Sequence, residues 1–519
     1  MRPRPGLDTL RSPVSTLVQI ASPVCSFVLP NTYRDSVELM RVAAELEARP
    51  GIHRAALVIA TSANRDVLSA AGLLAGDALT AGPNDLIVAI AGETGAVDDA
   101  QAHARLLLSG RAGQSARADQ QREPPHTLAE ALDELPDASL ALISTPGTFA
   151  TAEALKALKR GLDVFLFSDN VSVEDEIELK ALARRKGLLV MGPDCGTAIL
   201  SGVPLGFANA VRAGSIGLIG ASGTGLQEVA CQINVRGEGI SGAIGVGGRD
   251  LDERIGGTMM LAALERMAAD AQTRVIVLVS KPPAPAVATH VLVQARQCGK
   301  PVVVNFLGAP PSPNTDSLVF ADTLEAAAAS AVALARGEPP PAEPVALSDE
   351  LVLAASAQGS RLAAGNRRIV GLYSGGTLCK EASHLLHQLL PLGTHDLIDL
   401  GDDEFTVGRP HPMIDARLRS ERIVAVGADS DVGVLLLDVV LGYGSHPDPA
   451  GGLVEAIAAA RQAAARAGRY LAVVGSVCGT PEDPQNLADQ QAKLHAVGVV
   501  LAPSNAQAAR LAAQIAGAV

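Results

Sequence analysis

The same local pattern occurs twice in this chain: an apolar run, a glycine-rich turn and the start of a helix. The first copy is residues 217–228 (GLIGASGTGLQE), and the second is residues 371–381 (GLYSGGTLCKE). In both copies a threonine is followed by a glutamate four residues later. This repeat predicts two related strand–turn–helix units, one in each of two similar domains.

Each turn has the composition of an anion-binding site. The first backbone N–H groups of a helix have no acceptor inside the helix, and the helix dipole adds positive potential at that end. Glycine lets an anion approach the backbone closely, so such a turn can hold a phosphate. An ordinary capped helix is the simpler interpretation of one copy, but two copies in matching contexts favour anion binding. The predicted phosphate-binding residues are Ser222, Gly223, Thr224, Ser374, Gly375, Gly376 and Thr377.

Composition excludes several classes of protein. Hydrophobic residues make up 48% of the 519 residues, but aromatic residues only 2%, which suits buried parallel strands covered by alanine-rich helices. The net charge of −13 argues against nucleic acid as a partner. No apolar run reaches the roughly 18 residues of a membrane helix, and residues 1–17 lack the apolar core of a secretion signal. The six cysteines lack the spacing of metal ligands, so we expect free thiols in the cytoplasm and no metal site.

Strand and helix patterns alternate along the chain, which predicts an α/β fold with right-handed parallel crossovers. We expect an N-terminal α/β unit with a flexible start and a linker, and then a Rossmann-like domain. Two flavodoxin-like domains related by the internal repeat follow, and a proline-rich linker (GEPPPAEP) separates them. The expected boundaries are 1–126, 127–212, 213–336, 337–347 for the linker, and 348–519.

Turns at the predicted strand ends carry further candidates, because ligands of open parallel sheets bind at the carboxyl ends of strands. For Arg249 and Asp250, in the third domain's loop, a structural role is an equal alternative. A nucleophilic role for Cys195 is disfavoured, since no histidine is an evident base partner and buried cysteine is common. The predicted substrate- or cofactor-binding residues are Thr145, Asp194, Cys195, Gly248, Arg249 and Asp250.

The corresponding loop of the last domain, residues 401–415 (GDDEFTVGRPHPMID), is the most polar of these turns. We predict His411 as a catalytic general acid or base; the alternative is a histidine that braces its neighbours. Arg409 suits a bidentate contact to a carboxylate or phosphate, or else a salt bridge to Asp402 or Asp403. The loop carboxylates could bind Mg²⁺ together with phosphate, or be solvated.

Two other residues follow predicted strands. Lys281 ends a buried strand and either holds an anion or is a solvated strand end. His446 lies in a strand-end loop of the last domain, where a structural role is favoured.

The order of the motifs resembles a known family. GPDC at 192–195, Ser-Gly-Thr at 222–224 with its later glutamate, and GVGG at 245–248 resemble the alpha subunit of succinyl-CoA synthetase. The C-terminal domain resembles the carboxyl domain of that enzyme's beta subunit. One chain with both, together with NTY at 31–33 and RPHPMID at 409–415, resembles the FdrA family of acyl-CoA synthetases.

The resemblance covers nearly the whole chain. It implies a CoA-binding-type Rossmann domain followed by two ligase-type domains, in which two glycine-turn helices point at one phosphate. It also implies separate partner subunits of the same pathway, and we expect an oligomer.

The chain departs from the synthetase pattern at three places. The segment where the family carries its phosphorylated histidine, residues 308–328, contains no histidine. A nucleotide-grasp domain has no counterpart, and the glycine-rich loop that holds CoA phosphates is unmatched. We therefore do not expect this chain alone to be a nucleotide-driven ligase.

Three functions remain open. The resemblance to FdrA implies a component of an oxamate carbamoyltransferase in ureide catabolism, with phosphate or carbamoyl phosphate as ligand. The second is an acyl-CoA synthetase-like subunit that binds CoA and finds its nucleotide site on another chain. The third is a non-catalytic scaffold subunit.

Overall fold

The structure is a computed structural model that describes residues 23–32, 34, 36–109, 125–309, 312–342, 345–363, 365–406 and 410–517. The predicted catalytic residue Arg409 lies outside the described residues. Residues 1–124 with 403–410 make one compact unit, and 125–402 with 411–519 make a second.

The first unit is built on a small antiparallel sheet. Its strands lie in the order β1-β3-β2, and the central strand β3 is buried along its whole length. This continuous apolar strand (LIVAIAG) supplies the core against which α2 and α4 pack. The elements are β1 (Val24–Leu29), α2 (Ser36–Glu47), β2 (Ile52–Ile59), α3 (Ser62–Ala70), η1 (Gly76–Thr80), β3 (Leu86–Gly92), α4 (Thr94–Leu108) and α14 (Asp403–Thr406).

The second unit begins with a three-stranded parallel sheet in the order β4-β5-β6. Helices follow β4 and β5, as the alternating pattern predicts, and Ser172 caps α7 by accepting the Asp175 N–H. The elements are α5 (Leu128–Glu134), β4 (Leu140–Ile143), α6 (Gly147–Lys159), β5 (Asp163–Leu166), α7 (Val173–Lys186) and β6 (Val190–Met191).

A seven-stranded sheet follows, in the order β13-β12-β11-β9-β10-β7-β8. The expected boundary at 212 assigned the hairpin β7–β8 to the preceding domain, but in the structure this hairpin pairs antiparallel with β10. The elements are β7 (Thr197–Leu200), β8 (Val203–Gly206), β9 (Ala213–Ala221), α8 (Gly223–Val235), β10 (Ile240–Gly245), α9 (Thr258–Ala269), β11 (Val275–Ser280), α10 (Pro285–Gln297), β12 (Val302–Phe306), β13 (Leu318–Phe320) and α11 (Leu324–Arg336).

The last part is a five-stranded parallel sheet in the order β15-β14-β16-β17-β18. The elements are α12 (Asp349–Gly359), β14 (Arg368–Tyr373), α13 (Gly376–Leu389), β15 (His395–Asp399), α15 (Arg417–Ala428), β16 (Val432–Val440), α16 (Gly451–Arg466), β17 (Ala472–Cys478), α17 (Leu487–Ala496), β18 (Val499–Ala502) and α18 (Asn505–Ile515).

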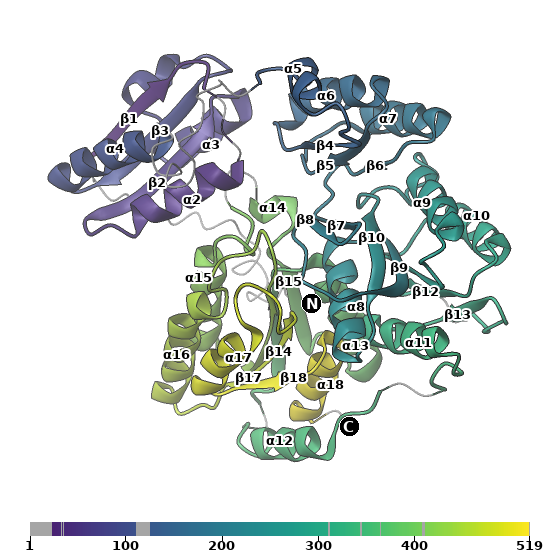
Figure 1. The fold of residues 1–519 in the computed structure, drawn as a ribbon. Helices are drawn as coiled ribbons and strands as arrows, with labels where there is room; N and C mark the ends of the chain where they lie inside the picture. The colour runs from purple at the N-terminus through teal and green to yellow at the C-terminus, as the bar shows by residue number, and fades with distance from the viewer. Residues whose placement is uncertain are drawn as a thin grey trace, which may run out of the picture. The chain divides into compact units, whose positions relative to one another are not determined.

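Helices α8, α11, α13 and α18 lie between the seven-stranded and the five-stranded sheet (Figure 1). One continuous apolar core contains residues of both sheets and of these helices, such as Leu226 of α8 and Leu378 of α13. The predicted α/β fold class is thereby confirmed, and the two repeated units share a core.

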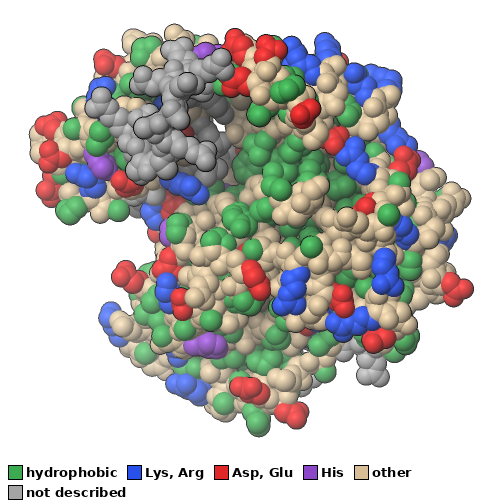
Figure 2. Space-filling model, viewed as in Figure 1, with side chains coloured by type: hydrophobic (Ala, Val, Ile, Leu, Met, Phe, Trp, Pro, Cys, Tyr) green, Lys and Arg blue, Asp and Glu red, His purple; other side chains and the backbone are tan. Residues whose placement is uncertain are grey.

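In the described part of the chain, no helix combines the length and the apolar composition that crossing a membrane would require. On the face drawn in Figure 2, basic and acidic side chains are interspersed rather than gathered by sign.

Candidate functional site

The two glycine-rich turns meet. The hydroxyl oxygens of Ser222 and Thr377 lie 2.6 Å apart, and both side chains are buried. A Cβ atom placed on Gly375 would lie 3.0 Å from Cγ2 of Thr224, and one placed on Gly225 would lie 3.1 Å from Cγ2 of Thr377. The N-termini of α8 and α13 are therefore in direct contact through their turns, which the sequence could only suggest.

The first turn ends in an ordinary helix N-cap. Ser222 is the N-cap of α8, and its hydroxyl accepts the Gly225 N–H at 3.1 Å. The N–H groups of Gly223 and Thr224 belong to the first turn and have no acceptor inside the helix. They remain available to an anion at the positive end of the helix dipole.

The second turn is held by a distant carboxylate. Asp438, at the end of β16, accepts the N–H groups of Ser374 at 2.8 Å and Gly375 at 2.7 Å, and also the Ser374 hydroxyl. Arg419 pairs with Asp438 at 2.7 Å, and both side chains are buried. Two of the predicted phosphate-binding N–H groups thus donate to an internal carboxylate, which leaves those of Gly376 and Thr377 at the start of α13.

A second carboxylate faces the start of α13. Asp399 is the last residue of the neighbouring strand β15, and its Oδ1 accepts the Gly401 N–H at 3.0 Å. A Cβ on Gly376 would lie 2.3 Å from Asp399 Oδ2, so glycine allows this close approach. Burial raises the pKa of Asp399 to about 6, against the lowering effects of the Gly401 N–H and of Lys281.

His411 lies beside Gly401, which approaches the Ser374 carbonyl of the second turn. The Met413 N–H donates to its Nδ1 at 3.2 Å, and a Cβ on Gly401 would lie 2.6 Å from its Nε2. Its ring packs on Phe207 with the ring centroids 5.8 Å apart. Burial lowers the pKa of His411 to about 4. At neutral pH the ring is uncharged, so Nε2 carries the proton and is a hydrogen-bond donor, and the ring is a weak base.

Asp250 lies in a buried ion-pair network, and the exposed Arg249 pairs with one of its members. Lys180 of α7 contacts Glu176 at 2.7 Å and Asp250 at 2.8 Å, and Arg249 contacts Glu176 at 2.9 Å. Asp250 also accepts the Met259 and Met260 N–H groups at the start of α9. The network joins α7 to the loop after β10. These contacts indicate a structural role for Arg249 and Asp250.

The other predicted binding residues lie in turns after three strands: Asp194 and Cys195 after β6, Gly248 after β10 and Thr145 after β4. Cys195 is buried, and burial raises the pKa of its thiol to about 12, which disfavours a nucleophile. Asp194 is exposed with a left-handed φ of 53°, and Gly248 is exposed in the loop after β10. Thr145 Oγ1, before α6, is buried and has no hydrogen-bond partner among the described residues.

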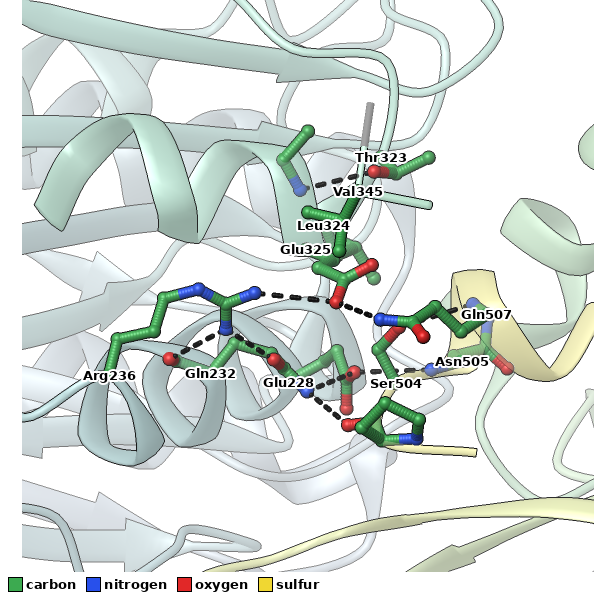
Figure 3. A network of polar contacts seen from close by, with 12 residues as sticks. Glu228, Gln232, Arg236, Thr323, Leu324, Glu325, Val345, Ser504, Asn505 and Gln507 are labelled. Carbon is green, nitrogen blue, oxygen red and sulfur yellow. Dashed lines mark hydrogen bonds and ion pairs between the residues drawn. The ribbon is translucent and has the colours of Figure 1, made fainter. Parts of the chain in front are cut away.

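The repeated glutamates, which were not predicted as site residues, meet behind the turns. Asn505 at the start of α18 donates its backbone N–H to Glu228 at 3.3 Å and its side-chain N–H to Glu381 at 2.8 Å. The Gln507 amide donates to Glu325 at 2.6 Å in the same network (Figure 3). Burial raises the pKa of Glu228 and of Glu381 to about 7. The threonine–glutamate spacing shared by both repeats was the available signal.

A small cavity of about 10 Å³, roughly the room of one water molecule, adjoins the second turn. Ser374, Arg419 and His446 are among its lining residues. The Asp448 N–H donates to Nδ1 of His446 at 2.9 Å, which braces the loop that contains this histidine.

Comparison with known proteins shows the family to which this chain belongs. Over 507 residues the chain is 42% identical to YahF of Escherichia coli strain K12, and the match covers 93% of this chain and 97% of YahF. The chain belongs to the YahF family. Three family models match parts of this chain: "AllF, heavy metal-associated domain" at residues 23–125, "CoA binding domain" at 211–308 and "CoA-ligase" at 372–515.

This YahF-family chain is also related to the alpha subunit of succinate–CoA ligase. The Trichomonas vaginalis mitochondrial subunit alpha-2 is 31% identical over 150 residues, 28% of this chain and 47% of that subunit. The chain thus matches about half of the length of such subunits. A dinucleotide-forming acetyl-coenzyme A synthetase 1 from Ca. Korarchaeum cryptofilum aligns over 73% of this chain and 82% of its own, at 18% identity and with a TM-score of 0.28.

The heavy-metal description of the first unit does not fit its residues. Residues 23–125 contain one cysteine, Cys25. Within the described part of the chain, no group of three or more His, Cys, Asp or Glu side chains is placed to hold a metal ion.

Proposed function

We propose that this YahF-family chain is an FdrA-type component of a carbamoyl-transfer enzyme, and that it binds phosphate or carbamoyl phosphate at the paired turns. The observation that carries the proposal is the 2.6 Å contact between the hydroxyl oxygens of Ser222 and Thr377. It brings two helix N-termini, each with positive potential and unpaired N–H groups, to one place.

The turns supply donors suited to a phosphate. The Gly223 and Thr224 N–H groups come from α8, and those of Gly376 and Thr377 come from α13. Charge-assisted hydrogen bonds to such donors are worth about 1.5–3 kcal/mol each. Asp438 and Arg419 fix the second turn by a buried ion pair, so its geometry is set before a ligand arrives.

The proposed reaction is the transfer of a carbamoyl group between phosphate and the nitrogen of oxamate. In one direction the oxamate amide nitrogen attacks the carbonyl carbon of carbamoyl phosphate, and the carbon–oxygen bond to phosphate breaks. The proton lost by the nitrogen passes to the released phosphate, so oxalurate and hydrogen phosphate form. The chain's part is to stabilise negative charge on the departing phosphate.

His411 can act as a hydrogen-bond donor to the phosphate in this reaction. Its neutral ring has Nδ1 occupied by the Met413 N–H, so Nε2–H faces the second turn and can donate to a phosphate oxygen. A pKa of about 4 makes the ring a poor proton acceptor at neutral pH. We therefore assign it oxyanion stabilisation rather than proton abstraction.

The full activity would need other subunits. The AllF description of the first unit supports a place in ureide or allantoin catabolism, and the resemblance to FdrA supports separate partner proteins and an oligomer. The described cysteines are all free thiols, which supports the cytoplasm as the location.

CoA binding is a second candidate function, and the matches to CoA-binding and CoA-ligase models favour it. Thr145 Oγ1, in the turn after β4, is buried and has no hydrogen-bond partner among the described residues. Thr145 and Asp194 would then contact CoA, which would supply a thiol as acyl acceptor. In that case the chain is an acyl-CoA synthetase-like subunit whose nucleotide site lies on another chain.

Calorimetric titration of the purified chain tests the proposal, with phosphate, carbamoyl phosphate and CoA as ligands. The variant is Ser222→Ala/Thr377→Val, which removes both facing hydroxyls. The control is Ser172→Ala/Ser348→Ala, which removes two N-cap serines elsewhere and costs similar stability.

We expect carbamoyl phosphate to bind the parent chain and the control, and the turn variant at least tenfold more weakly. Binding of CoA alone would favour the second candidate. If the turn variant retained full carbamoyl phosphate binding and full activity in the reconstituted complex, a scaffold role would replace catalysis.

A further inference from the structure

We propose that Asn505, the first residue of α18, is a positioning residue that holds the two glycine-rich turns in the arrangement needed to share one phosphate. It acts through Glu228 of α8 and Glu381 of α13, the glutamates repeated in the two units. The inference rests on the proposed function for its ligand, and the positioning itself can be measured without a ligand.

One directed contact between the turns does not fix how α8 and α13 lie relative to each other. The hydroxyl oxygens of Ser222 and Thr377 lie 2.6 Å apart, but a single hydrogen bond is also a pivot. Apolar packing between the helices is not directional. Donors from both turns must be held within about 0.5 Å and 10–20° to bind one ligand well, so a second directed contact is needed.

Asn505 provides this second contact. Its backbone N–H donates to Glu228 at 3.3 Å, and its side-chain amide donates to Glu381 at 2.8 Å and to the Leu378 carbonyl of α13 at 2.9 Å. Glu228, Glu381 and Asn505 are each at most 2% exposed. Each glutamate follows a turn threonine by four residues, so the bridge lies about 6 Å along each helix from the turn.

Further hydrogen bonds hold the two glutamates. Gln232 of α8 donates to the Glu228 carboxylate at 3.2 Å, beside the bond from Asn505 (Figure 3). The Leu324 N–H, at the start of α11, donates to Oε1 of Glu381 at 2.6 Å. Both carboxylates are therefore fixed by more than one donor, and Asn505 is the donor that they share. A buried bridge of this kind ties the two helix starts together.

Gln507 offers a matched comparison on the same helix. Its side-chain amide is also buried and donates to a buried carboxylate, that of Glu325, at 2.6 Å. Glu325 belongs to α11, which carries neither glycine-rich turn. Loss of either amide removes a buried hydrogen bond and should lower stability to a similar extent. Only the loss at Asn505 breaks the bridge between α8 and α13.

The first test is amide hydrogen exchange of the full chain without ligand, followed by mass spectrometry. The variants are Asn505→Ala and, as the control, Gln507→Ala. In Asn505→Ala we expect peptides from 217–228 and 371–381 to exchange at least about fivefold faster, because the helix starts open more often. These peptides should exchange at the parent rate in the control, although the urea midpoint falls in both variants.

The second test is calorimetric titration with inorganic phosphate. We expect Asn505→Ala to bind phosphate roughly tenfold more weakly, and the control to stay within about twofold of the parent chain. Asn505→Asp/Glu381→Gln exchanges donor and acceptor in the bridge to α13 and should recover part of the lost affinity. Asn505→Asp alone sets two carboxylates against each other and should not. Circular dichroism checks that all variants are folded.

Two results would overturn the positioning role. One is exchange at the turns that is unchanged in Asn505→Ala or rises equally in Gln507→Ala. The other is an unchanged phosphate affinity in Asn505→Ala. Failure of the proposed function looks different, because phosphate would then not bind the parent chain or would bind without regard to Ser222 and Thr377. The exchange rates would still decide whether Asn505 positions the turns.

Discussion

Ser222 and Thr377 are 155 residues apart in the chain, and their hydroxyl oxygens lie 2.6 Å apart in the structure. Each belongs to one copy of the repeated turn, so the internal repeat forms a single place where two helices begin. The tight fit around this contact leads to the first prediction.

Replacing Gly375 by alanine should force the two turns apart. The added Cβ would meet Thr224 Cγ2 at 3.0 Å and Asp438 Oδ2 at 3.1 Å. Overpacking of this kind costs about 1–3 kcal/mol, so we expect a lower urea midpoint. Thr224→Ser in the same background removes the methyl group and should recover part of the loss. Gly248→Ala, where a Cβ meets open space, is the control; equal midpoints for Gly375→Ala and this control would contradict the contact.

The second prediction concerns the ion pair of Asp438 and Arg419. Asp438→Asn leaves a buried guanidinium without its counter-charge and turns an amide N–H toward the Ser374 or Gly375 N–H. Removing one partner of such a buried pair costs about 3–5 kcal/mol, which chemical denaturation measures. Asp396→Asn breaks a partly exposed pair with Arg368 and should cost under about 1 kcal/mol. Similar losses for both variants would show that Asp438 does not fix the turn.

The third prediction is a pH dependence of stability from Glu228 and Glu381. Their folded pKa of about 7 lies above the ordinary value of 4.5, so the folded state holds protons that the unfolded state releases. The stability from this difference is fully present below about pH 4.5 and is lost as pH rises through 7. One pKa unit corresponds to about 1.4 kcal/mol, so the loss is a few kcal/mol.

Glu228→Gln tests this dependence, because a neutral amide removes one of the two titrations. We expect the unfolding free energy to fall less between pH 5 and pH 8 in this variant, measured with urea at each pH. Glu455→Gln, at an exposed position on α16, should leave the parent profile unchanged. A Glu228→Gln profile parallel to that of the parent chain would contradict the assignment.

The fourth prediction concerns thiol reactivity. Burial raises the pKa of Cys195 to about 12 and also raises those of Cys231 and Cys379. Iodoacetamide at pH 8 should therefore modify Cys298, which is partly exposed, well before Cys195 in the folded chain. Peptide mass spectrometry over time measures both. Modification of Cys195 at the rate of Cys298 would restore it as a candidate nucleophile.

Several features were predictable because they depend on local sequence. Hydrophobic runs and turns indicated the α/β class and the parallel strands. An ordinary capped helix was the simpler interpretation of one turn, because a cap and its helix are contiguous, and Ser222 does cap α8. The second turn was harder. Its N–H groups are held by Asp438, a residue 64 positions away on another strand, and no local pattern connects the two.

The sequence by itself determined the repeated turns, the alternation of strands and helices and the absence of histidine from 308–328, because each is a property of neighbouring residues. Only the tertiary structure decided that the turns touch, that Asp438 occupies two of the predicted N–H groups and that Glu228 and Glu381 share Asn505. These contacts form when two sheets bury their helices in one core, and that packing brings together residues that are far apart in the chain.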